Sequence, residues 1–147
     1  MTHNALDIAQ WFINRAAMDA DTKGGEYITN LKLQKMLYYA QGCNGAIFDR
    51  RLFDEEIVAW THGPVVVEVY NKYSAYSGNA IDTKQEVTFD EETNGLLENV
   101  YNTFGQYSAW KLRNMTHAED PWKNTHNRET IPYEAIVDYF KREIVVD

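Results

Sequence analysis

The sequence predicts a mainly α fold: a compact single-domain helical bundle of about six or seven helices with at most a short β-hairpin. The apolar residues recur mostly at spacings of three and four, which is the period of an amphipathic helix. The segments with strand character are too short to form a dominant sheet. The 147 residues contain no internal repeat, low-complexity segment or interdomain linker, so we expect one domain over residues 1–147.

The first predicted helix covers residues 5–17, where the apolar side chains follow a single stripe. Asn4 precedes this stripe and has the short polar side chain that is typical of an N-cap. Residues 19–26 contain two adjacent glycines among charged side chains, a composition typical of a surface loop. We therefore expect the first helix to end before this loop.

The second predicted helix covers residues 30–41. We expect Gly42 or Gly45 to end it, because glycine readily adopts the backbone conformation that follows a helix. The helix is apolar over more than half of its circumference, which predicts a central position in the fold. Lys35 and Tyr39 are four residues apart, so they could share one accessible face.

The middle of the chain is predicted to turn twice. Short apolar runs between residues 47 and 60 could form a hairpin around Asp49-Arg50. Gly63 then permits backbone angles that other residues avoid, and Pro64 suits the first position of a helix because its φ is fixed and it donates no N–H. We therefore expect a strand-to-helix or turn-to-helix corner, followed by a helix from Pro64 to about Tyr76.

Cap residues predict the remaining helix starts. Short polar side chains that can accept a hydrogen bond from the first turn stand at Thr29, Asp90, Ser108 and Asp120. Gly105 is expected to close the helix that begins after Asp90. Pro121 is expected as the first residue after its cap, and Pro132 is expected to open the last helix.

The charge of the chain limits its partners. Fourteen basic and twenty-two acidic residues give a net charge of −8, which disfavours nonspecific binding to nucleic acid or to an anionic membrane. A basic protein partner suits this charge, although solubility alone would also explain it. One cysteine excludes an intrachain disulfide, and no apolar run approaches the ~18 residues of a membrane span. We therefore expect a soluble, cytoplasmic protein that binds neither nucleic acid nor membrane.

The residues that carry chemistry do not form a recognisable catalytic or metal motif. The candidate metal-ligand types are His62, His117, Glu119 and His126, and their spacing matches no helical metal-binding pattern. Cys43 follows a predicted helix, whose negative end disfavours a thiolate. His62 with Glu119, or His117 with Asp120, could form an acid–base pair, but any small protein offers such pairs. We predict no enzymatic activity, no metal and no cofactor.

Three segments carry more specific information: residues 33–42 (LQKMLYYAQG), residues 60–70 (WTHGPVVVEVY) and residues 116–122 (THAEDPW). In sequence, order and spacing they resemble the Panacea antitoxin domain family, which includes SocA-like antitoxins and GepA-type phage-associated proteins. The resemblance covers most of the chain. It departs from the usual pattern at Met36, where leucine is more common, and at Cys43-Asn44, where the family often has a bulkier aromatic residue or histidine.

The resemblance implies an antitoxin, which is a non-enzymatic protein that binds and neutralises a cognate protein toxin encoded beside it. Panacea domains are paired with toxins of very different kinds, so the resemblance does not identify the chemistry of the toxin. The residues agree with a binding module. An acidic surface would accelerate the encounter with a basic toxin, and aromatic anchors would hold the complex.

The same segments supply the candidate site. We expect the toxin-binding or signature surface, here called the signature set, to consist of Lys35, Tyr39, Trp60, His62, Tyr70, His117 and Trp122. Gly63, Pro64 and Pro121 are expected to form a structural corner. The alternative is that the signature residues belong to the core and the turns and only hold these corners together.

Two further functional hypotheses remain open at this point. The protein could be a proteolytic adaptor that delivers a toxin to a protease, as the SocA-like relatives suggest. It could instead be a prophage-encoded binder of a host protein. A toxin lifetime that depends on the protease would favour the adaptor, whereas a neighbouring reading frame that is lethal only without this protein would argue against the host-protein binder.

Overall fold

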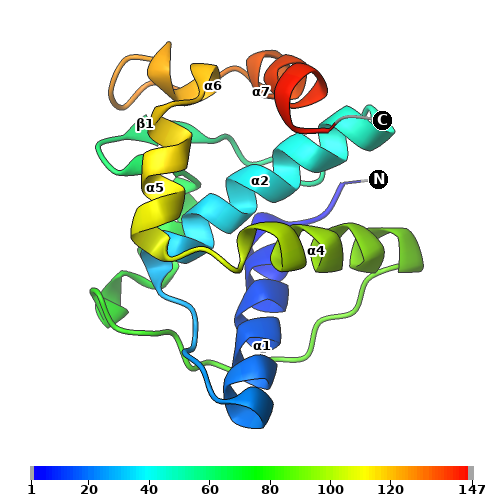
Figure 1. The fold of residues 1–147 in the computed structure, drawn as a ribbon, viewed down its shortest axis with the longest axis vertical. Coiled ribbons are helices and arrows are strands. Elements are labelled where there is room, and N and C mark those ends of the chain that lie inside the picture. Colours follow the sequence, from blue (N-terminus) through cyan, green and yellow to red (C-terminus); the bar gives the residue numbers. More distant parts are fainter. Residues whose placement is uncertain (1, 146–147) are drawn as a thin grey trace.

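The computed structural model describes residues 2–145 and confirms the mainly helical fold class. Within these residues it contains seven α-helices and one short antiparallel hairpin (Figure 1). The helices are α1 (Ala5–Lys23), α2 (Asn30–Phe48), α3 (Val67–Lys72), α4 (Glu91–Phe104), α5 (Ala109–His117), α6 (Asp120–Lys123) and α7 (Tyr133–Tyr139). The strands are β1 (Val58–Trp60) and β2 (Gly63–Val65), and two short helical segments are η1 (Ser74–Tyr76) and η2 (Phe140–Ile144).

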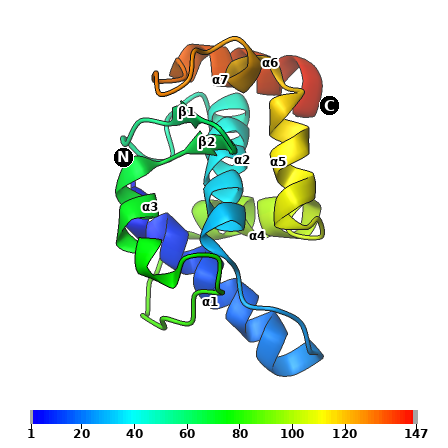
Figure 2. The ribbon, with the colours of Figure 1, turned by 90° about the vertical axis from the view of Figure 1, so that its left-hand side faces the viewer.

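Helix α2 is the centre of the fold, as its apolar circumference predicts. It packs against α1, α4, α5, α7 and strand β2. Figure 2 shows it running between the hairpin on one side and α5 on the other. Every residue from Leu33 to Gly45 is buried, so this helix has no solvent-facing side over those positions.

The predicted end of the second helix at Gly42 or Gly45 is wrong, because α2 continues to Phe48. Both glycines permit close packing of the C-terminal helices. A Cβ added at Gly42 would lie 2.5 Å from the ring of Phe140, and one added at Gly45 would lie 2.6 Å from Val137 Cγ2. The helix ends instead at Asp49, which adopts a left-handed conformation.

The predicted hairpin around Asp49-Arg50 is also wrong. The observed hairpin pairs Val58 with Val65 and Trp60 with Gly63, so it turns at Thr61-His62. The corner at Gly63 is therefore a strand turn, and Pro64 lies in β2 instead of opening a helix. The following helix begins only at Val67.

Most predicted caps are confirmed. The side chains of Asn4, Thr29, Asp90 and Ser108 each accept a hydrogen bond from a backbone N–H in the first turn of the following helix. α1 nevertheless continues to Lys23, through part of the predicted loop. At α6 the cap is Glu119, one residue earlier than predicted, and Pro121 is the second helical residue. None of the helices in residues 2–145 is long and apolar enough to cross a membrane.

Gly42 should tolerate no larger side chain. We expect Gly42→Ala to lower the free energy of unfolding by about 1–3 kcal/mol, the usual cost of overpacking. The Phe140 ring is fully buried and contacts the Tyr38 ring edge-on, with 5.3 Å between centroids, so it has little room to withdraw. Urea denaturation measures the change.

Gly95 in α4 provides the matched control, because a Cβ there would meet nothing within 4 Å. The higher helix propensity of alanine should make Gly95→Ala more stable than the parent by about 0.5–1 kcal/mol. Equal effects of the two substitutions would contradict the packing role of Gly42.

Candidate functional site

Four members of the signature set border one pocket of about 270 Å³ between α2, the hairpin and α3. We call it the hairpin pocket, and its lining includes Gln34, Lys35, Trp60, His62, Tyr70 and Arg128. Trp60 and His62 come from the hairpin, and Tyr70 comes from α3. Residues 126–130 follow α6, and Glu129 accepts a hydrogen bond from the Ala59 N–H of β1 through its carbonyl oxygen (2.9 Å).

The hairpin is held in place by contacts of its aromatic and polar neighbours. The indole Nε1 of Trp122 donates a hydrogen bond to the carbonyl oxygen of Trp60 (2.8 Å). The ring of Trp60 meets the ring of Tyr70 edge-on, with 5.0 Å between centroids. The Gln34 side chain accepts a hydrogen bond from the Val66 N–H (2.9 Å), which ties the entrance of α3 to α2. These contacts fix the position of the hairpin, which forms one wall of the pocket.

Lys35 lies buried beneath this hairpin, so the prediction that it shares an accessible face with Tyr39 is wrong for both residues. Its ammonium donates one hydrogen bond, to the carbonyl oxygen of Pro64 (3.3 Å). A Cβ at Gly63 would lie 2.7 Å from Lys35 Cε and 2.9 Å from Thr116 Oγ1. Gly63, with φ of 116°, is therefore required both by its backbone angle and by the close approach of the lysine.

Burial and, to a smaller extent, the nearby positive charge of Arg113 together lower the pKa of Lys35 to about 7. A lysine with such a pKa exchanges between its charged and neutral forms near neutral pH. Lys35 therefore differs from an ordinary lysine, which stays charged throughout this pH range.

Tyr39 belongs to a buried cluster around Glu119. The hydroxyls of Tyr38 and Tyr39 donate to the two carboxylate oxygens of Glu119, each at 2.8 Å. The ring of Tyr39 also stacks on Phe104, with 3.9 Å between centroids. Burial raises the pKa of Glu119, and the two hydrogen bonds act in the opposite direction. Tyr39 thus has a structural role, and it ties α2 to the segment before α6.

The rings of His117 and Trp122 stack face to face, with 3.8 Å between their centroids. The Nε2 atom of His117 is buried without a hydrogen-bond partner among the described residues. Burial lowers the pKa of His117, and the charges of Arg113 and Lys35 lower it further. Pro121, the third predicted corner residue, is buried in the same α6 turn.

The two acid–base pairs considered from the sequence do not form hydrogen bonds. The Nδ1 atom of His62 accepts a hydrogen bond from Arg113 Nε (3.2 Å), whereas both carboxylate oxygens of Glu119 accept hydrogen bonds from tyrosine hydroxyls. Within residues 2–145, no three His, Cys, Asp or Glu side chains gather in an arrangement that could hold a metal ion.

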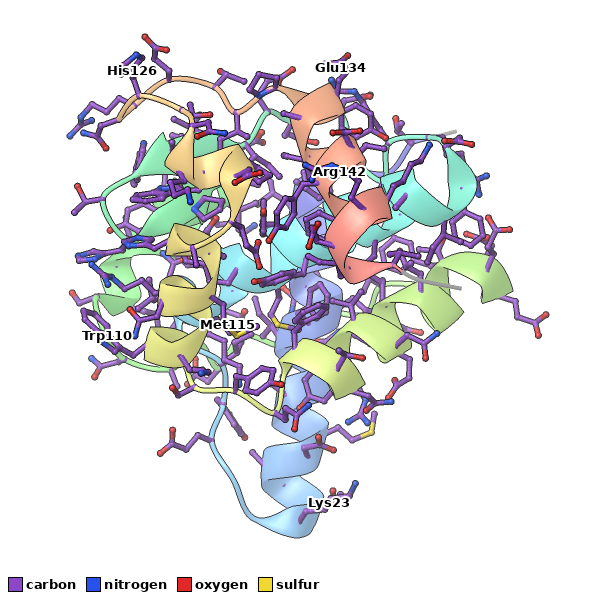
Figure 3. The ribbon with its side chains drawn as sticks, turned by 45° about the horizontal axis from the view of Figure 1, so that its top comes forward. Lys23, Trp110, Met115, His126, Glu134 and Arg142 are labelled. Carbon is purple, nitrogen blue, oxygen red and sulfur yellow. The ribbon has the colours of Figure 1, made fainter. Side chains whose placement is uncertain are left out.

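Three residues near the pocket were missed by sequence reasoning. The guanidinium of Arg113 lies 4.4 Å from the ring centroid of Trp110, and that ring lies 6.0 Å from the ring of His62. Trp110 is 56% exposed, and Figure 3 shows it at the periphery beside α5. Arg128 enters the pocket lining from the loop after α6. A lone exposed tryptophan and scattered arginines give no sequence signal until the fold brings them together.

The Glu119 cluster should contribute strongly to stability. Glu119→Ala is expected to lower the free energy of unfolding by about 2–4 kcal/mol, because two buried phenol hydroxyls lose their acceptor. Glu119→Gln keeps one acceptor oxygen, and we expect it to cost less than half as much. Chemical denaturation of both variants checks this, and equal losses would contradict the hydrogen-bonding role.

Lys35 predicts a pH dependence of stability. Its pKa is about 7 in the folded chain and 10.5 as an ordinary value, so between these pH values the unfolded chain binds the additional proton. The free energy of unfolding should therefore rise as the pH increases from 7, by roughly 1–2 kcal/mol at pH 8.5. Denaturation at several pH values measures this rise.

The substitution Lys35→Met should abolish the rise between pH 7 and 8.5. This range avoids Cys43, whose buried thiol has a pKa raised to about 12 and would lower stability only as unfolded cysteine ionises near pH 9. An unchanged slope in the variant would assign the pH dependence to other groups.

Comparison with known proteins gives one match. The family model described as "Antitoxin SocA-like, Panacea domain" matches residues 33–123, from the first turn of α2 to the end of α6. Neither the curated proteins nor the solved structures gave a match. The match covers more than half of the chain and includes all three segments that carry the resemblance. The chain therefore belongs to the SocA-like antitoxin Panacea domain family.

Proposed function

We propose that this protein is an antitoxin that neutralises a cognate protein toxin by binding it directly, without catalysis. Membership of an antitoxin domain family supports a toxin partner, which we expect to be encoded by the adjacent gene. The observation that carries the proposed site is the hairpin pocket, where Lys35 of the first signature segment lies with Trp60, His62 and Tyr70 of the second. The proposed binding face is the mouth of this pocket and its surroundings.

The surface around the pocket contains exposed aromatic residues and an arginine, which are typical of protein interfaces. Tyr70 and Trp110 are two of the four large hydrophobic residues that are exposed in the described chain. Arg113 lies over Trp110 and donates to His62, so an arginine and two aromatic side chains adjoin the pocket wall. Tryptophan, tyrosine and arginine are the residues most often found at the energetic centres of protein interfaces. This supports a protein partner at this face.

Two members of the signature set, Tyr39 and Trp122, have a supporting role in this proposal. Tyr39 holds the Glu119 cluster, and Trp122 holds the Trp60 carbonyl. Replacing them would affect toxin binding by disturbing the hairpin, whereas replacing the exposed residues would remove contacts with the toxin. Substitutions at the exposed residues are therefore the informative ones.

The test is neutralisation by surface variants. Tyr70→Ala and Trp110→Ala should each weaken binding to the toxin at least tenfold, which corresponds to about 1.4 kcal/mol. Met18→Ala is the control, because Met18 is 57% exposed but borders other hollows at α1. Its binding should stay within about twofold of the parent. The measurements are co-purification with the protein encoded beside this chain, titration calorimetry, and rescue of growth.

Each result has a clear reading. Failure to bind or rescue would reject the antitoxin function, and equal effects of all three variants would reject this face. Direct neutralisation also requires that the purified protein alone blocks the toxin in vitro. Toxin removal that occurs only when a protease is present would instead support the proteolytic adaptor.

A further inference from the structure

The hairpin pocket differs in charge from the rest of the molecule. The chain carries a net charge of −8. Among the described residues that line the pocket, none is an aspartate or a glutamate, while Lys35, His62 and Arg128 are all basic types. Arg113 adds a further positive charge behind His62. The pocket is therefore a basic recess in an acidic protein.

Lys35 is the buried charge of this recess. An ammonium group can donate three hydrogen bonds, and in this fold it donates one, to the Pro64 carbonyl oxygen. No carboxylate in residues 2–145 lies within ion-pairing distance of its Nζ atom. A buried charge without a counterion is costly unless a partner group supplies one. The pocket above Lys35 is where such a group has room.

The size of the pocket limits that group. Its volume of about 270 Å³ lies just below the ~300–1,000 Å³ range of sites for small molecules. A single amino-acid side chain fits this space. The rings of Trp60 and Tyr70 meet edge-on in its wall and offer an apolar surface for the methylene part of that side chain.

We propose that the hairpin pocket receives one acidic side chain, an aspartate or glutamate, of the toxin and neutralises its carboxylate with Lys35 and Arg128. This inference rests on the proposed function and identifies the chemistry of the contact. The acidic surface attracts a basic toxin at long range, and the basic pocket then selects one acidic residue on it. A basic pocket within an acidic surface fixes the orientation of the complex, because a neutral or basic toxin side chain at this point leaves Lys35 without a counterion.

The contact also links binding to protonation. A carboxylate in the pocket favours the charged form of Lys35. Because the pKa of Lys35 is about 7 in the unbound protein, formation of the complex at or above neutral pH is accompanied by uptake of a proton. The other titratable or charged groups near Lys35 are Arg113 and His117 of α5, and His62 and Arg128 line the same pocket. All are basic types, so none of them replaces the missing counterion. Affinity should therefore fall as the pH rises above 7.

A small probe tests the pocket without the toxin. The probe is N-acetylglutamic acid α-amide, which carries one side-chain carboxylate, and its control is N-acetylglutamine α-amide, which has the same shape without the charge. We expect the acid, at millimolar concentration, to shift the NMR signals of the Trp60 and Tyr70 rings at least fivefold more than the amide. Lys35→Met and Arg128→Gln should abolish this preference. Equal shifts with both probes, or none with either, would overturn the proposal.

The toxin itself provides the second arm. Each aspartate and glutamate of the toxin is replaced, one at a time, by asparagine or glutamine. Binding of each toxin variant is measured to the parent antitoxin and to its variants Lys35→Met and Arg128→Gln. Lys141→Met is the control, because Lys141 pairs with Asp49 away from the pocket. One toxin substitution should weaken the affinity for the parent antitoxin at least tenfold. The same toxin substitution should weaken the affinity for Lys35→Met less than threefold, because that variant has already lost the contact. Circular dichroism verifies that the variants are folded, and Arg128→Gln, on the exposed loop, gives an independent reading.

The outcomes separate the two levels of the argument. Toxin that binds tightly but shows no acidic residue coupled to Lys35 or Arg128 would overturn the acidic contact and leave the antitoxin function intact. Binding that is lost only when the C-terminal carboxylate of the toxin is blocked by a glycine-serine extension would also overturn it. A protein that binds the glutamic acid probe selectively but no toxin would reject the proposed function while retaining an acid-specific pocket.

Discussion

The fold depends on one constraint: the central helix α2 is buried on all sides from Leu33 to Gly45, yet it carries many polar side chains. A buried polar group must find a hydrogen-bond partner, or it destabilises the fold. In α2 these side chains bind the backbone of the surrounding irregular segments. Asn30 donates to the Tyr70 carbonyl, and Gln41 accepts from the Leu52 and Phe53 N–H groups and donates to the Phe53 carbonyl. The helix thus stabilises chain segments that have few hydrogen bonds of their own.

The same constraint places the candidate site. Gln34 and Lys35 lie on consecutive positions of α2 and bind Val66 and Pro64, which both lie just before the start of α3. The turn of the hairpin therefore rests on the polar face of a buried helix, and Gly63 is needed because any side chain would collide with Lys35. The corner that looks like a local strand-to-helix motif in the sequence is held mainly by a helix that precedes it by about thirty positions, a non-local stabilisation typical of irregular segments.

The sequence was most informative where the determining interaction is local. Asn4, Thr29, Asp90 and Ser108 cap their helices through hydrogen bonds that span only two or three residues. A glycine has two opposite uses that sequence alone does not separate. Gly105 does end α4, whereas Gly42 and Gly45 lie inside α2 and admit the side chains of distant helices. The length of α2 was missed for this reason.

The candidate site shows the same division. The resemblance identified Trp60, His62 and Tyr70, and the fold brings these residues to one pocket. It also selected Lys35 and Tyr39 as surface residues, because their spacing in the helix places them on one side. Periodicity cannot show that the hairpin covers Lys35, or that the rings of Phe104 and Phe140 cover Tyr39. Partners from other elements, such as Glu119 for Tyr39, become visible only when the fold sets them at 2.8 Å.

Charge distribution links these structural features to a binding function. Long-range attraction depends on the total charge, and a net charge of −8 favours the approach of a basic protein. Short-range selectivity depends on desolvated groups, and the hairpin pocket places Lys35 where water is excluded. In the proposed contact, the negative surface attracts many basic proteins, whereas the positive pocket stabilises only a partner that places an acidic side chain in it. A buried lysine whose pKa lies near 7 suits this role, because a partner carboxylate raises that pKa and so increases the fraction of lysine that is charged at neutral pH.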